Sequence, residues 1–165
     1  MSTTSLLDVA LDSWDRNNTI LVNLLRAVSK SGLEAKASPT GPSVAQMFTH
    51  IHYVRLVLIS EDAPDIEVEV PENEWVAKVD PEQIVQMLSQ SADVVRDVLR
   101  NRLKTGGEMK IHYDHPLLFL QHMIWHEGYH HGQIKLALKL TGQPISDEDA
   151  GPITWDVWME KTRTE

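Results

Sequence analysis

The sequence predicts an all-α protein, a four-helix bundle with a short C-terminal helix. Apolar residues recur at the spacing of one helix face in four long segments, and glycine or proline separates these segments. A strand-like alternation occurs once, over residues 66–70, and it has no evident partner strand. The 165 residues suit one domain with a buried core, so we expect a single domain over residues 1–165.

The first two predicted helices lie in the N-terminal part of the chain. The first runs from about Leu6 to Val28. Its apolar face comprises Leu7, Leu11, Trp14, Leu21, Leu25 and Val28. A loop rich in glycine and proline follows over residues 31–42. Ser43 then stands where an N-cap is expected, which predicts a second helix from there to about Ile59.

A long connection separates the second helix from the third. Residues 61–80 are acidic and punctuated by proline, which predicts an extended loop. Asp80-Pro81 combines an N-cap residue with proline at the first helical position, so the third helix begins there and runs to about Leu103. The length of this connection favours a crossover topology over a simple up-down-up-down order.

The fourth predicted helix begins at Pro116 and ends at Thr141-Gly142, with the glycine as a left-handed C-cap. The tail over residues 143–165 carries Trp155 and Trp158, three positions apart. This spacing predicts one short helix that packs on the bundle.

The composition excludes several classes of partner. A formal net charge of -9 argues against binding to nucleic acid or to an anionic membrane. No apolar run approaches the ~20 residues of a membrane span, and the N-terminal residues Met-Ser-Thr-Thr-Ser lack the basic segment of a signal peptide. The chain has no cysteine, which removes thiolate sites and suits a reducing compartment. We therefore expect a cytoplasmic protein.

Histidines concentrate on the fourth predicted helix. The chain has eight, five of them between His112 and His130. At 100° per residue, a stripe about 80° wide contains Phe119, His122, His126, His130, Gln133, Ala137 and Leu140. Leu118, Tyr129 and Leu136 flank this stripe on one side, and Met123 and Ile134 on the other. We predict that this stripe faces the core, where unpaired imidazoles would be costly.

The pair His126 and His130 predicts a metal site, because side chains at i and i+4 can direct two ring nitrogens at one cation. The second helix offers His50 or His52 as a third ligand. The helical wheel does not decide between them, and we prefer His50 because Ser43 and Gln46 make its surroundings more polar. Three neutral histidines leave a coordination position open and suit zinc, nickel or iron(II). A polar histidine cluster without metal is the alternative.

Other polar and aromatic residues are weaker candidates. Tyr53 and Gln133 could be polar neighbours of the site, and the loop residues His112 and His115 could border its mouth. The acidic segment from Glu67 to Glu74 could cover that mouth. Outside the site, His131 is expected at the surface and Trp125 in the core or a subunit interface.

The stretch from His126 to His130 also matches H-E-x-x-H, the signature of zinc metalloproteases. In such an enzyme Glu127 would be the general base and a downstream acid, such as Glu148, the third ligand. Glu148 lies in a predicted loop, and no sheet edge is evident to hold a peptide, so this is the less favoured interpretation.

The longer context resembles a different group. The run from Leu120 to Ile134, with His-x3-His-x3-His followed shortly by Gly-Gln and an aliphatic residue, is similar to the fourth helix of the DinB family, the YfiT-like metal-dependent enzymes. The segment Phe48-Thr49-His50-Ile51 is similar to that family's second-helix motif. The resemblance extends over the whole chain in length and helix order, although the matching residues are few.

This resemblance implies an up-up-down-down four-helix bundle, often dimeric, with His50, His126 and His130 as metal ligands. It also implies that His122 lies just behind the ligands. His131 departs from the family pattern, in which many members carry arginine. Some relatives of this kind use the metal to activate a low-molecular-weight thiol such as bacillithiol or mycothiol. We therefore expect a metal-dependent transferase or hydrolase that acts on a small molecule, with a non-catalytic, stress-associated metal-binding bundle as the alternative.

Overall fold

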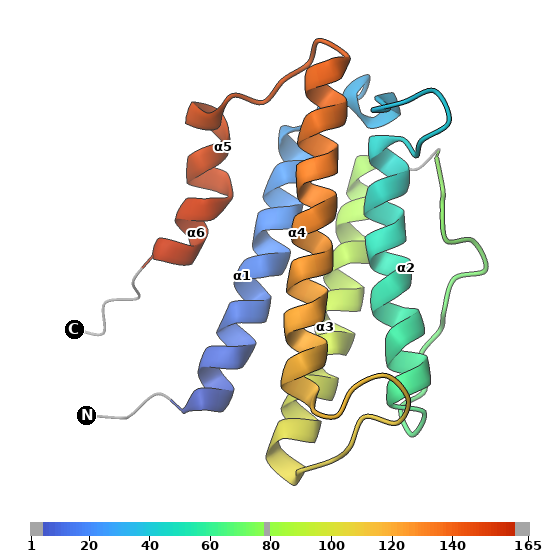
Figure 1. The fold of residues 1–165 in the computed structure, drawn as a ribbon, viewed down its shortest axis with the longest axis vertical. Helices are drawn as coiled ribbons and strands as arrows, with labels where there is room; N and C mark the ends of the chain where they lie inside the picture. The colour runs from blue at the N-terminus through green and yellow to red at the C-terminus, as the bar shows by residue number, and fades with distance from the viewer. Residues whose placement is uncertain (1–4, 78–79, 161–165) are drawn as a thin grey trace.

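The computed structural model describes residues 5–77 and 80–160, and the outermost residues of the predicted domain, 1–4 and 161–165, lie outside this part. The chain is all-helical over the described residues, without strands (Figure 1). The four long helices are α1 (Leu6–Ala27), α2 (Val44–Asp62), α3 (Pro81–Thr105) and α4 (Pro116–Leu140). One 3-10 turn, η1 (Gly32–Glu34), precedes α2, and two short helices, α5 (Asp147–Ile153) and α6 (Trp155–Met159), follow α4. The sequence therefore predicted all four long helices. In the tail it predicted one short helix, whereas the structure has two, α5 and α6.

The helices run side by side, and their order of directions is up, down, down, up (Figure 1). The connection over residues 28–43, which contains η1, reverses the chain between α1 and α2. The connection after α2, described to residue 77, travels back along the bundle, and α2 and α3 are parallel (Figure 1). The predicted crossover is therefore present. It lies between the second and third helices, so the up-up-down-down order implied by the resemblance is wrong.

The helix boundaries follow local capping chemistry. Ser43 and Gln46 form a reciprocal capping box at the start of α2. Asp80 caps α3 ahead of its proline, and Gly142 adopts φ 76° after α4, a conformation that glycine enters at little cost. The α2 helix continues three residues past the predicted Ile59, because buried Asp62 accepts backbone N–H groups from Ile111 and His112.

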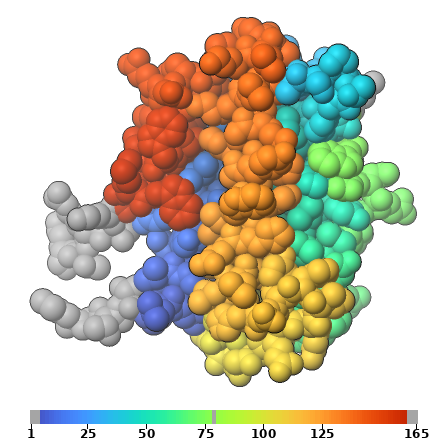
Figure 2. Space-filling model, viewed as in Figure 1, coloured from blue at the N-terminus to red at the C-terminus, as the bar shows by residue number. Residues whose placement is uncertain are grey.

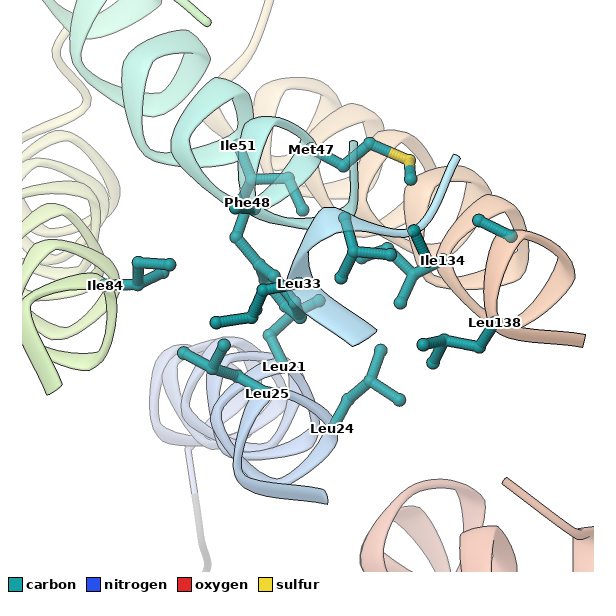
Figure 3. Close-up of a cluster of buried hydrophobic side chains, with 14 of the residues drawn as sticks. Leu21, Leu24, Leu25, Leu33, Met47, Phe48, Ile51, Ile84, Ile134 and Leu138 are labelled. Atoms are coloured by element: carbon teal, nitrogen blue, oxygen red, sulfur yellow. The ribbon is translucent and has the colours of Figure 1, made fainter. Parts of the chain in front are cut away.

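Two apolar clusters form the core. The cluster in Figure 3 joins the C-terminal halves of α1 and α4 to the N-terminal halves of α2 and α3. Its labelled members are Leu21, Leu24, Leu25, Leu33, Met47, Phe48, Ile51, Ile84, Ile134 and Leu138. The second cluster fills the other end of the bundle around Trp14, whose indole N–H donates to the Ala92 carbonyl at 2.9 Å. None of the helices described here is long and apolar enough to cross a membrane.

The core-facing side of α4 differs from the predicted stripe. Its buried residues are Pro116, Phe119, Leu120, Met123, Glu127, His130, Ile134, Ala137 and Leu138. The expected core positions His122 and Leu140 are exposed, as are Leu118, Tyr129 and Leu136. The stripe is rotated because α4 is apolar on nearly all sides, so periodicity alone does not identify the side that packs on its neighbours. His131, expected at the surface, is partly buried, and its Nε2 has no hydrogen-bond partner among the described residues.

Candidate metal centre

Three imidazoles from two helices converge on one point. His50 projects from α2, and His126 and His130 project from α4 one turn apart. The Nε2 atom of His126 lies 3.3 Å from that of His50 and 3.1 Å from that of His130. Two nitrogens bound tetrahedrally at 2.0–2.1 Å from one zinc ion are separated by about 3.3 Å. The spacing of the three nitrogens therefore fits a shared cation.

The surroundings keep these imidazoles neutral. Burial, followed by the charges of His130 and His50, lowers the pKa of His126 to about 3. Burial and then the charge of His50 lower the pKa of His130 to about 4, with a small opposing effect from Gln133. Burial also lowers the pKa of His50, against the opposing effect of Glu74. All three rings therefore offer unprotonated nitrogens near neutral pH, as metal ligands must.

The connection between α2 and α3 holds the His50 ring in place. The Glu74 carboxylate lies 2.7 Å from Nδ1 of His50, and the Trp75 ring stacks on the imidazole at 4.0 Å with an interplanar angle of 5°. Thr49 fixes this segment to α2, because its hydroxyl accepts the Val76 N–H at 3.0 Å. Figure 2 shows the segment in green against α2, on the face where α4 lies. A carboxylate on Nδ1 orients Nε2 towards a metal and raises its basicity.

The other two ligand candidates lack such support. Nδ1 of His126 and Nδ1 of His130 are buried without hydrogen-bond partners among the residues described. An unpaired buried polar atom costs about 1–3 kcal/mol. A cluster of neutral, partly unpaired imidazoles does not stabilise a helical bundle, so it calls for a functional explanation.

The sequence pattern of the DinB family matches residues 1–151. The chain belongs to the DinB family. A crystal structure of a DinB family member from Exiguobacterium sibiricum 255-15 superposes with a TM-score of 0.61 at 20% identity, covering 87% of this chain and 97% of that chain. No curated protein sequence matches this chain. The chain therefore shares its family and its fold with this Exiguobacterium protein.

Three further residues were expected near the ligands: His122 from the resemblance, and Gln133 and Tyr53 as polar neighbours. His122 is exposed, with its ring 6.3 Å from that of His126 and its Nδ1 2.7 Å from the Tyr113 hydroxyl. Gln133 is partly buried and donates to the Tyr129 hydroxyl at 2.9 Å. Tyr53 is half-buried, and in the described part of the chain it makes no ring contact or hydrogen bond with the three histidines. Gln133 and His122 therefore lie beside the candidate ligands, and the described residues show no contact between Tyr53 and the three histidines.

The remaining histidines have local structural partners. His52 points towards α3, where its Nδ1 lies 2.7 Å from the Met87 carbonyl. His112 pairs with buried Asp62 at 2.8 Å. His115 caps α4 by accepting the Leu117 N–H at 3.1 Å. Both loop histidines therefore have local partners outside the cluster, and the choice of His50 over His52 agrees with the geometry.

The metalloprotease interpretation fails on the position of Glu127. Its carboxylate is buried and binds Arg55 of α2 through two hydrogen bonds of 2.6 and 2.8 Å. Asn17 of α1 donates to the same carboxylate. Glu148, the proposed third ligand of that alternative, is exposed on α5. Glu127 is therefore a structural partner of Arg55 and not a general base beside the histidines.

Sequence reasoning missed three residues that shape this centre. Glu74 and Trp75 approach His50 from a loop whose position local patterns do not specify. Arg55 forms a buried ion pair with Glu127, the neighbour of His126 in the sequence. This pair could have been predicted, because an arginine in one apolar helix and a glutamate in another are expected to pair when both are buried. On sequence alone, the acidic segment from Glu67 to Glu74 could cover the mouth of the site. Glu74 of this segment does contact His50, although that individual contact was not predicted.

Proposed function

We propose that this DinB family protein holds one divalent transition metal, zinc, nickel or iron, on His50, His126 and His130, and serves as a transferase or hydrolase for a small molecule. The observation that carries the proposal is the convergence of three neutral Nε2 atoms at 3.1 and 3.3 Å. When bound, such a cation lowers the pKa of a coordinated thiol or water and provides a nucleophile near neutral pH. Three protein ligands leave a position open for that group.

The chain's own side chains supply positioning and an apolar rim. Glu74 and Trp75 fix the orientation of the His50 ring from one side. On α4, the exposed Tyr129 ring lies 5.3 Å from the His130 ring and stacks with Trp125 at 6.3 Å. Aromatic faces at the edge of a site favour a small substrate with an apolar portion.

A spectroscopic titration tests this function. The protein is loaded with cobalt(II) or nickel(II), and bacillithiol, mycothiol or glutathione is added in turn. We expect a sulfur-to-metal charge-transfer band with at least one thiol, followed by transfer of that thiol to an electrophile. The His126→Ala variant should show no band, whereas His115→Ala, which removes only the cap of α4, should behave as wild type.

The outcomes separate catalysis from metal storage. A loaded protein that responds to no thiol but hydrolyses esters or amides at the metal remains within the proposal as a hydrolase. A loaded protein that binds neither thiol nor substrate contradicts the proposed chemistry and favours the non-catalytic, metal-binding bundle. In that case removal of all three histidines should cost much of the folding stability of the loaded protein, because metal-binding free energy then acts as folding free energy.

A further inference from the structure

A second pocket lies on the far side of α4 from the candidate metal centre. It has a volume of about 220 Å³, and residues of α1, α4 and the tail around α6 line it. Two of its α4 residues, Gly128 and His131, lie about 100° or more around the helix from His126 and His130. Figure 2 shows part of α1 in blue between α4 in orange and the tail helices in red. The pocket and the metal centre therefore share a helix but no residue.

The walls of this pocket are apolar and aromatic. Trp155 and Trp158 of α6 form one side, and the apolar residues of the two long helices are Ile20, Leu21 and Ile124. No lysine or arginine is among the described residues that line it, which disfavours an anionic ligand. An apolar cavity of about 150 Å³ can hold benzene. This pocket is therefore large enough for a substituted aromatic ring.

One polar atom beside the pocket lacks a partner. His131 lines the pocket, and its Nε2 is buried without a hydrogen bond among the described residues. The Glu127 carboxylate, which also lines the pocket, is satisfied because it accepts hydrogen bonds from Arg55 and Asn17. An unpaired buried polar atom costs about 1–3 kcal/mol. A hydroxyl group both donates and accepts, so it satisfies the imidazole nitrogen in either tautomer.

Gly128 leaves one side of the pocket without a side chain. It lies inside α4, where glycine is about 0.8–1.0 kcal/mol less favourable than alanine. Neither packing nor backbone conformation within the chain requires glycine here. A Cβ atom at this position would meet no other atom within 4 Å, and φ is not positive. The space that this glycine leaves is therefore available to a ligand.

The wall formed by the tail is fixed to both long helices. Asn23 of α1 donates to the Ile153 carbonyl at 3.1 Å, and Arg16 of α1 donates to a backbone carbonyl of α6. On the other side, the Lys135 ammonium of α4 lies 5.5 Å from the centre of the Trp155 ring. The pocket is therefore preformed, which lowers the entropic cost of binding a ligand.

We propose that this pocket is a second binding site, and that it takes a small, uncharged aromatic molecule with one hydroxyl group. The aromatic ring packs against Trp155 and Trp158, over the space that Gly128 leaves, and the hydroxyl group pairs with Nε2 of His131. This proposal depends neither on a bound metal nor on the reaction proposed for the metal centre.

Two-dimensional NMR of nitrogen-15-labelled protein tests the site, because each of the five tryptophans has its own indole N–H signal. p-Cresol is added in steps, and single tryptophan-to-phenylalanine variants assign the signals. We expect saturable shifts at Trp155 and Trp158, with a dissociation constant below about 1 mM. No saturable shift in the folded wild type would overturn the proposal. Shifts confined to Trp75, which stacks on His50, would also overturn it, because the ligand would then lie at the metal centre.

Gly128→Leu fills the pocket and should weaken p-cresol binding by roughly tenfold or more. The variant should stay folded, because leucine favours a helix more than glycine does and its Cβ meets no other atom. Gly132→Leu is the matched control, since it makes the same change one turn later, in open space outside the pocket. It should bind p-cresol as wild type does. Unchanged binding in a folded Gly128→Leu variant would overturn the proposal.

His131→Leu separates the hydrogen bond from the apolar walls. Toluene has the ring of p-cresol without the hydroxyl group, so the ratio of the two affinities reports on the hydrogen bond alone. In the variant, the affinity for p-cresol relative to toluene should fall by roughly three- to tenfold, the usual contribution of one hydrogen bond. An unchanged ratio would overturn the assigned hydroxyl group.

Discussion

Glu127→Gln is expected to destabilise the protein by about 3–5 kcal/mol, the cost of breaking a buried ion pair. The Arg55 and Glu127 side chains are 0% and 1% exposed. The Arg55 guanidinium also donates to the Leu88 carbonyl at 2.8 Å and lies 4.8 Å above the Trp14 ring. The neutral amide leaves this guanidinium without a counter-charge in the middle of the bundle. Denaturant titration followed by circular dichroism measures the loss.

Two further variants make this result specific. Glu108→Gln removes an exposed carboxylate and should leave stability within about 0.5 kcal/mol of wild type. Arg55→Met/Glu127→Leu removes both charges and should recover much of the loss, since apolar replacement of a whole pair is often close to neutral. A Glu127→Gln variant with wild-type stability would contradict the structural role. Glu127 would then again be a candidate general base.

Glu74→Gln is expected to weaken metal binding by about 10–100-fold, the usual effect of losing the carboxylate behind a histidine ligand. The glutamine carbonyl can still accept a hydrogen bond from Nδ1 of His50, but it no longer raises the basicity of the ring. Trp75 remains stacked on that ring, so the site should keep its shape. Competition with a chromogenic chelator measures the dissociation constant.

Glu72→Gln is the matched control, because it removes an exposed carboxylate from the same segment two residues earlier. Its affinity for metal should equal that of wild type. Equal losses in the two variants would mean that Glu74 acts only through the net charge of the loop. Unchanged affinity in Glu74→Gln would mean that this carboxylate does not support His50 at all.

The long helices were predictable because their signals are local. Ser43, Asp80-Pro81 and Gly142 act within one turn of the helix ends that they define. The order of helix directions was not predictable in this way, since it depends on how the long connection packs along α2. The two tail helices were difficult for a similar reason, because helices this short depend on packing more than on their own propensity.

Part of the histidine cluster was predictable because His126 and His130 lie one turn apart on a long helix. The third histidine required a contact between α2 and α4 that periodicity leaves open. The more polar surroundings of His50 and the family resemblance both favoured it over His52. Contacts to Glu74 and Trp75 come from a loop, whose path depends on tertiary packing. The rotation of α4 was misjudged because leucines and aromatic residues cover both its core-facing side and its exposed side. Apolar character therefore could not identify the side packed within one chain.

The most direct test of the metal centre is elemental analysis of protein purified without chelator or histidine tag, together with a folded His126→Ala/His130→Ala variant. The geometry predicts about one zinc, nickel or iron ion per wild-type chain and none in the variant. A folded wild-type protein that contains no metal, and that takes up neither zinc nor nickel on titration, would contradict the central claim.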